Sequence, residues 1–146
     1  MKVKSVTING FRGYSKPTKI EFDKLCVIIG KNDIGKSTIL EALDIFFNEG
    51  KGCVKLDKDD INKDNLALGK DSIEIEVEFT DLPNEIVIDS TNFTTLEDEY
   101  LLTSEKTLRI IKKYKNAGKA QVFIRANHPV NEECKDLLQK KIAELK

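Results

Sequence analysis

The chain has 146 residues, the size of one domain or of a piece of a larger protein. It carries 24 Lys and Arg against 25 Asp and Glu, and the net charge of -1 excludes attraction to nucleic acid through overall charge. A hydrophobic content of 40% supports a buried core, and no apolar run approaches the roughly 18 residues of a membrane span. The three cysteines show no metal-binding or redox spacing, so we expect a cytoplasmic protein.

Two short strands joined by a glycine-containing turn are expected at the N-terminus. Residues 2–9 and 19–22 alternate between apolar and polar side chains. The turn between them, residues 10–14, reads GFRGY and carries Arg12. Two interpretations of Arg12 stay open: a neighbour of a bound nucleotide, or an ordinary solvated turn residue.

The next stretch fits the phosphate-binding loop pattern G-x-x-x-x-G-K-[ST]. The apolar run 25–29 before it predicts a strand buried on both faces, with Cys26 in the core. The apolar positions of residues 39–47 after it predict a helix buried beneath a sheet, with Gly50 in the left-handed position that stops it. The loop and the first helical turn consist of Gly30, Lys31, Asn32, Asp33, Ile34, Gly35, Lys36, Ser37 and Thr38.

This loop predicts a binding site for a nucleoside triphosphate. Gly30 and Gly35 allow the main chain to approach phosphate oxygens, and the amides of the first helical turn point at the anion. Lys36 would contact the β- and γ-phosphates, Ser37 a magnesium ion, and Thr38 the α-phosphate side. The alternative is a strand–helix turn that binds no ligand.

The middle of the chain predicts a loop followed by antiparallel strands. Residues 51–70 predict a surface excursion with one short helical turn, and residues 62–65 resemble a guanine-reading N-K-x-D pattern whose last residue is wrong. The strand expected over residues 72–80 alternates cleanly, as is typical of an antiparallel sheet. Residues 107–114 and 120–126 predict a hairpin with Gly118 in the left-handed position of its turn.

One face of this sheet is expected to carry a glutamate row from residues 72–80 near a basic row. The basic row includes Arg109, Lys113 and Lys115. Cross-strand charge pairs, worth about 0.2–1 kcal/mol each, are one interpretation. Contact with nucleic-acid phosphates is the other, and the glutamates speak against it because they cancel much of the field.

A hydrolytic phosphate-loop enzyme also needs an acid after an apolar strand to hold the magnesium shell. The candidate is Asp89, which follows three apolar residues and a turn. A loop or edge-strand role for Asp89 is favoured. The alternative function is a self-contained small NTPase or nucleotide kinase that uses Asp89 as its metal-shell acid.

The last residues predict an amphipathic helix. Asn131 suits the N-cap position, and the pattern runs to Lys146 without a cap, so we expect the natural chain to continue. The apolar stripe consists of Cys134, Leu137, Leu138, Ile142 and Leu145.

The whole chain resembles the N-terminal part of the head in ABC-type, SMC/RecF-like ATPases. The matching segments are residues 9–14, 27–38 and 40–43. Asn32 at the third loop position is typical of this group, and Asp33 is similar to the version in the OLD family of ATP-dependent nucleases. That family includes the ATPase–nuclease subunit of the Gabija anti-phage system.

The resemblance implies an α/β fold, namely the N-terminal lobe of an ABC-type P-loop NTPase head with a mixed or antiparallel sheet around a buried Walker A helix. Residues 1–128 would form this lobe, and residues 129–146 would start a helical insertion. It implies ATP and Mg²⁺ as cofactors, a homodimer through the ATPase heads, and DNA as the substrate of a parent endonuclease in repair or anti-phage defence. The signature motif, the catalytic glutamate and the nuclease domain would come later, so this chain alone should hydrolyse ATP weakly or not at all.

Overall fold

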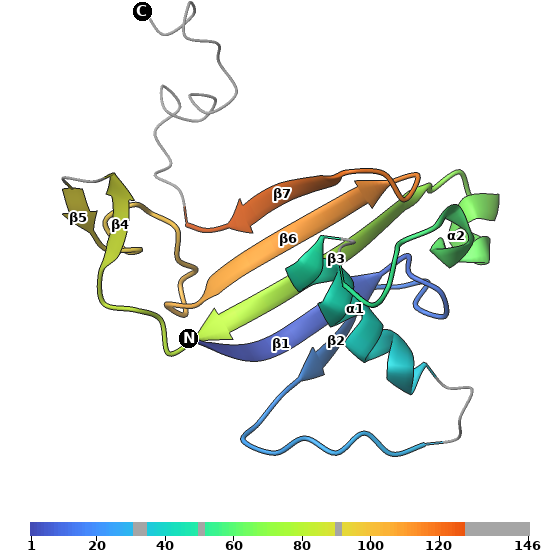
Figure 1. Ribbon diagram of the computed structural model, residues 1–146, viewed down its shortest axis with the longest axis horizontal. Helices are drawn as coiled ribbons and strands as arrows, with labels where there is room; N and C mark the ends of the chain where they lie inside the picture. Colours follow the sequence, from blue (N-terminus) through green and yellow to red (C-terminus); the bar gives the residue numbers. More distant parts are fainter. Residues whose placement is uncertain (31–34, 50–51, 90–91, 128–146) are drawn as a thin grey trace, which may run out of the picture.

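A single large sheet with one helix across its face forms the body of the protein. The computed structural model describes residues 1–30, 35–49, 52–89 and 92–127 (Figure 1). The elements are β1 (Lys2–Asn9), β2 (Thr18–Glu21), α1 (Lys36–Asn48), the 3-10 turn η1 (Lys58–Asp60), α2 (Lys63–Ala67), β3 (Ser72–Thr80), β4 (Ile86–Asp89), β5 (Asn92–Thr94), β6 (Leu108–Lys115) and β7 (Ala120–Arg125). The five-stranded sheet has the order β2-β1-β3-β6-β7, and β4 pairs with β5 separately. No helix in the described ranges is long and apolar enough to cross a membrane.

The alternating strands predicted from the sequence form the centre of the sheet. β1 and β3 have the predicted bounds and pair antiparallel, with Val6 opposite Val77. Both of these valines are completely buried, as are Ile73 and Ile75. The polar alternate positions of β3 therefore lie on the opposite face of the sheet.

Helix α1 buries one side against the sheet. Ile45 and Phe46 are buried, and the ring of Phe46 lies 6.4 Å from the ring of Phe79 on β3. The other side of α1 is open, because Leu40 is 62% and Phe47 is 52% exposed. Among the described residues, the helix is thus covered on one side rather than all round.

The end of α1 differs from the sequence expectation. The predicted stop, Gly50, lies outside the described residues. Glu49 takes the left-handed conformation, with φ 51°, and its N–H donates to the carbonyl of Ile45.

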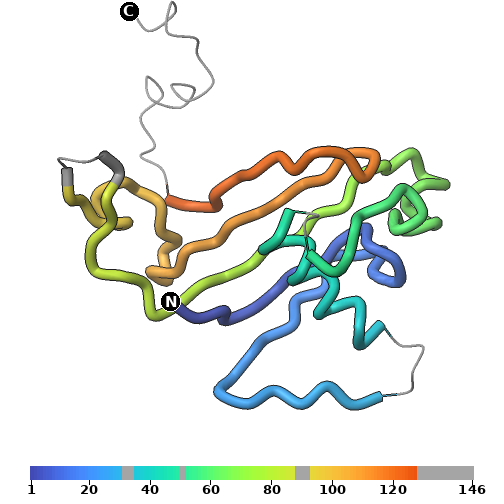
Figure 2. The backbone as a smooth tube through the Cα atoms, in the orientation of Figure 1, coloured from blue at the N-terminus to red at the C-terminus, as the bar shows by residue number. Residues whose placement is uncertain are grey.

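The apolar run before the phosphate loop is not the buried strand that its composition predicts. Leu25, Val27 and Ile29 are 83%, 69% and 88% exposed, and Cys26 is exposed rather than part of the core. Figure 2 shows this segment running outside the sheet. A buried strand needs neighbours for its main-chain N–H and C=O groups, and no strand in the described ranges pairs with this one.

The turn between β6 and β7 also corrects the sequence expectation. Asn116 and Ala117 hold the left-handed conformations, with φ 51° and 54°, and Gly118 does not. The N–H of Gly118 donates to the carbonyl of Lys115 at 2.9 Å, and a Cβ on Gly118 would lie 3.0 Å from that oxygen. The glycine therefore allows a close approach of two main-chain segments, whereas positive φ at both preceding residues makes the tight hairpin.

The glutamate and basic rows pair across the strands on the face away from α1. This arrangement confirms the cross-strand interpretation and leaves that face with much of its charge balanced. The pairs are Glu74–Lys113 at 2.8 Å, Glu78–Arg109 at 3.2 Å and Glu76–Arg125 at 3.2 Å.

Glu78 is the centre of this face and is only 2% exposed. Burial raises the pKa of its carboxyl, but hydrogen bonds from Lys4, Ser5 and Thr107 and the charge of Arg109 outweigh burial and lower the pKa to about 2. The three hydrogen bonds measure 3.1, 3.0 and 3.0 Å. The ionised carboxylate therefore joins β1, β3 and β6.

Candidate functional site

The N-terminus of α1 presents main-chain N–H groups that the helix itself does not use. Gly35 is the N-cap residue, with φ 74° and ψ 20°, a left-handed conformation that glycine adopts without penalty. No side chain caps the first turn, and that turn contains no acidic residue. Because the first N–H groups of a helix lack internal acceptors and the helix dipole is positive there, this end of α1 attracts an anion.

Lys36 lies over the same end of the helix. Its Nζ donates a hydrogen bond to the main-chain carbonyl of Gly30. A Cβ built on Gly30 would lie 3.7 Å from the Lys36 Cδ, so the start and the end of the loop are close together. The structure thus brings together the ammonium group and the two glycines that the sequence assigns to phosphate binding, while Lys31, Asn32, Asp33 and Ile34 lie outside the described residues.

The two hydroxyl residues after Lys36 differ in exposure to solvent. Ser37 is exposed, and Thr38 is 7% exposed. In phosphate-loop proteins the Ser or Thr after the lysine offers its hydroxyl to a magnesium ion that also contacts the phosphates. An accessible Ser37 hydroxyl at the anion-attracting end of α1 fits that role.

The turn between β1 and β2 holds the loop from the side. The hydroxyl of Tyr14 donates a 3.3 Å hydrogen bond to the carbonyl of Gly35. The turn is fixed at Gly10, where φ is +72° and a Cβ would lie 2.5 Å from the carbonyl oxygen of Ser72. Sequence reasoning missed Tyr14, although it belongs to the GFRGY segment that carries the family resemblance.

Arg12 lies in the same turn and is held by two carboxylates. Its Nε lies 2.8 Å from Asp60 Oδ1, and its Nη1 donates to Glu41 on α1. The guanidinium also lies 5.1 Å from the ring centroid of Phe11. Arg12 therefore ties the turn to α1 and to η1, and direct contact of Arg12 with a nucleotide stays a prediction.

The segment after α1 supports this turn. Asn62 is the N-cap of α2, accepting a hydrogen bond from the N–H of Asn65 at 3.0 Å, and its Nδ2 donates to the carbonyl of Arg12 at 2.6 Å. Ile61 and Asn62 are 3% and 7% exposed, so part of the predicted surface excursion is buried. The residues that resemble a guanine-reading pattern are thus used as a helix cap.

Asp89 is not brought to the loop. β4, which ends at Asp89, pairs with β5 in the two-stranded sheet. This small sheet lies at the opposite end of the molecule from the start of α1 (Figure 1). The described strands also pair antiparallel throughout, whereas the self-contained NTPase would need a mostly parallel sheet.

The phosphate-loop pattern, leading into the open N-terminus of a helix that packs on a sheet, assigns the chain to the α/β P-loop NTPase fold. The sequence profile of the AAA ATPase domain family matches residues 1–146, and the chain belongs to this family. Membership identifies the chain as an ATP-binding domain of an ATPase.

The chain is similar in sequence to part of an endonuclease. The chain is 29% identical over 123 residues to Endonuclease GajA of Bacillus cereus (strain VD045). The match covers 84% of this chain and 18% of GajA, so the chain spans less than a fifth of the length of that relative. This sequence similarity confirms the expected resemblance to the OLD and Gabija group.

Solved structures of SMC heads share the fold. A structure described as "Structural biochemistry of ATP-driven dimerization and DNA stimulated activation of SMC ATPases" superposes with a TM-score of 0.55 at 18% identity, over 95% of this chain and 78% of that chain. The SMC head domain from Thermotoga maritima gives a TM-score of 0.51 at 18% identity, over 94% of this chain and 42% of that chain. The expected SMC-type head fold is therefore confirmed.

Proposed function

We propose that this chain is the ATP-binding lobe of an OLD-type, ATP-dependent endonuclease that acts on DNA in repair or anti-phage defence. The open N-terminus of α1 carries the proposal, because left-handed Gly35 exposes the helix amides and Lys36 contacts the carbonyl of Gly30 at the start of the loop. The similarity to Endonuclease GajA over 84% of this chain supports the endonuclease part.

On this proposal each loop residue has a separate task. The amides of the first turn of α1 and the ammonium of Lys36 would bind the β- and γ-phosphates, with Lys36 exchanging its contact with Gly30 for the phosphates. Ser37 would hold a magnesium ion, which neutralises phosphate charge when bound. Thr38 would lie on the α-phosphate side, and Arg12 would lie beside the nucleotide.

Two uncovered apolar surfaces support the proposal that further parts of an ATPase head complete this site. One is the exposed segment 25–29, which leads directly into the loop, and the other is the outer side of α1 with Leu40 and Phe47. We propose that the rest of the head supplies neighbours for both and that two heads form a homodimer around ATP. Residues 129–146 would then start a helical insertion.

The proposal predicts nucleotide binding without efficient turnover by this chain alone. Binding of a fluorescent ATP analogue and release of phosphate can be followed in the same sample with Mg²⁺. We expect saturable binding and little or no phosphate release. Absence of binding would overturn the ATP-binding lobe, and steady turnover abolished by Lys36→Ala would overturn the claim that essential parts lie elsewhere.

The endonuclease part needs a separate test in the full-length protein. In the natural protein the rate of plasmid cleavage should change when ATP is added. In the Lys36→Ala variant the addition of ATP should leave this rate unchanged. If the full-length protein cleaves no DNA under any nucleotide condition, the endonuclease assignment is wrong while the ATP-binding lobe stands.

A further inference from the structure

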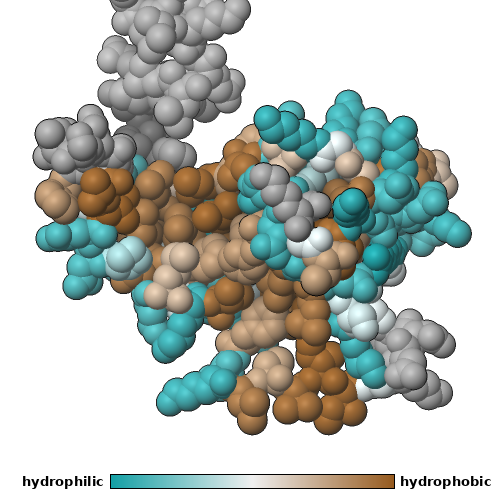
Figure 3. Space-filling model, in the orientation of Figure 1, coloured by the Kyte–Doolittle hydropathy of each residue, from teal (hydrophilic) through white to brown (hydrophobic). Residues whose placement is uncertain are grey.

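The α1 side of the sheet carries an apolar region that α1 does not cover. Lys112 on β6 identifies this side, because its Nζ donates to the carbonyl of Phe46 on α1. Its partner on β7 is Val122, and the next pair on the same face is Ile110 with Ile124. Val122 is 56% and Ile124 is 41% exposed. In Figure 3 the apolar surface continues beside α1 over the sheet.

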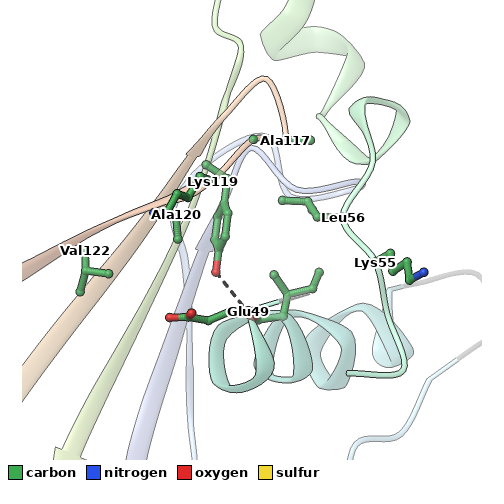
Figure 4. A pocket seen from close by; sticks show the side chains of 10 residues that line it. Glu49, Lys55, Leu56, Ala117, Lys119, Ala120 and Val122 are labelled. Atoms are coloured by element: carbon green, nitrogen blue, oxygen red, sulfur yellow. Dashed lines mark hydrogen bonds between the residues drawn. The ribbon is translucent and has the colours of Figure 1, made fainter. Parts of the chain in front are cut away.

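A pocket of about 520 Å³ lies where this region meets the C-terminal end of α1. Figure 4 shows the residues around it, with Val122 and Ala120 on β7 facing the end of α1 and Leu56 on the segment that follows. The hydroxyl of Tyr114 closes its floor by donating to the carbonyl of Ile45 at 3.4 Å. The apolar region therefore contains a depression into which a side chain from a covering element can insert.

We propose that residues 129–146 fold back as an amphipathic helix over β6 and β7 and bury their apolar stripe on this region. The stripe predicted from the sequence follows β7 directly along the chain. The stripe residues are Cys134, Leu137, Leu138, Ile142 and Leu145.

The point at which the chain leaves the sheet after β7 favours this segment as the occupant. β7 ends at Arg125, and the N–H of Asn127 donates to the carbonyl of Leu102 at 3.0 Å, so the chain is held at the end of the sheet up to that residue. Only residues 128–130 separate this anchor from the predicted N-cap at Asn131. A segment tethered this closely has a high effective concentration at the face, which a second copy of the chain lacks.

The dimensions also match. A helix over residues 131–146 would be roughly 24 Å long. The six residues of β7 span about 20 Å, so a helix returning antiparallel to β7 would cover the strand from end to end. A helical insertion would then leave the domain only after its first turns had packed on the sheet.

A disulfide trap tests the placement, because Cys134 belongs to the predicted stripe. The background is Cys26→Ser with Cys53→Ser, which removes the two exposed thiols. The test variants are Ile124→Cys and Val122→Cys on the inner face, and the matched control is Phe123→Cys, whose side chain lies on the opposite face of the same strand.

Under mild oxidation we expect an intramolecular link to Cys134 in at least one inner-face variant, formed about tenfold faster than in the control. Rates that do not differ between the faces would overturn the proposal. Links that join two chains would also overturn it and would assign the region to a second copy.

A substitution in the stripe gives a second readout that does not depend on register. Leu138→Asp should expose the sheet face and increase the fluorescence of a hydrophobic dye as much as deletion of residues 129–146 does. Gln139→Asp, outside the predicted apolar stripe, is the control and should leave the fluorescence unchanged. Equal dye binding by the deleted and the complete chain would overturn the proposal.

Discussion

The hydroxyl of Tyr14 donates a hydrogen bond of 3.3 Å to the main-chain carbonyl of Gly35. This contact joins the turn between β1 and β2 to the residue that opens α1. The same turn is bound to α1 a second time, through the hydrogen bond from Arg12 to Glu41. The orientation of the anion-attracting helix end therefore depends on a turn that lies some twenty residues earlier in the chain.

Tyr14→Phe should weaken ATP binding while leaving the fold intact. The substitution removes one hydrogen bond, worth about 1 kcal/mol, that fixes the carbonyl of Gly35, which corresponds to up to about fivefold in affinity. Tyr100→Phe is the control, because Tyr100 is 58% exposed. Titration with a fluorescent ATP analogue measures the effect, and equal affinities for the two variants would show that Tyr14 does not position the loop.

Gly35→Ala should lower ATP affinity and thermal stability together. Alanine in the left-handed conformation that Gly35 holds, with φ 74°, costs about 1–2 kcal/mol, although the added Cβ would meet Tyr14 only at 3.5 Å, an ordinary contact. Gly13→Ala is the control, since nothing lies within 4 Å of a Cβ there. Calorimetric melting with and without ATP checks both effects, and a Gly35→Ala variant that binds ATP normally contradicts the role of this conformation.

The role of Arg12 in holding the turn can be tested separately from a contact of Arg12 with the nucleotide. Asp60→Asn removes the charge of one anchor and keeps the arginine, whereas Arg12→Ala removes both the anchor and any contact with the nucleotide. If Arg12 lies beside the nucleotide, Arg12→Ala weakens ATP binding well beyond the effect of Asp60→Asn, at a similar loss of stability. Equal affinities in the two variants would restrict Arg12 to holding the turn.

Glu78 should make stability depend on pH in the acid range. Its pKa is lowered from 4.5 to about 2 in the folded protein, so its contribution is complete above pH 4.5 and is lost as the pH falls from 4.5 towards 2. Glu78→Gln should cost about 2 kcal/mol at neutral pH, because hydrogen bonds to a charged group are removed. The variant should also lose less stability than the natural protein between pH 4.5 and 2.

Urea unfolding at a series of pH values measures both effects. Glu74→Gln is the control, because Glu74 pairs with Lys113 and both side chains are more than a third exposed. Parallel pH profiles for the natural protein and Glu78→Gln would contradict the assignment of this pH dependence to Glu78.

The sequence predicted the strands of the sheet best. The segments 2–9 and 72–80 have the expected bounds, because alternation of apolar and polar side chains reports directly on the two faces of a strand. The prediction of a buried strand over residues 25–29 was wrong, because a continuous apolar run carries no such information about faces. A continuous apolar run indicates that a segment is suited to burial, but it does not say which neighbours bury it, and no described strand does.

The candidate site was predicted where a local pattern defines it and missed where distant residues build it. The loop pattern located Lys36 and Gly35 without the structure. No periodicity pairs Arg12 with Glu41 and Asp60, which lie 29 and 48 residues further along the chain. These contacts follow from the crossing of α1 and η1 over the turn, which is a property of the folded chain.

Isothermal titration of the chain with Mg²⁺ and ATP tests the assignment of the loop most directly. The natural chain should give a saturable one-site signal, and Lys36→Ala should bind at least about tenfold more weakly while its circular dichroism stays unchanged. Lys24→Ala, which changes a lysine before the loop, should bind like the natural chain. If the natural chain gives no binding, or if Lys36→Ala binds as tightly as Lys24→Ala, the loop at the start of α1 is not a nucleotide site.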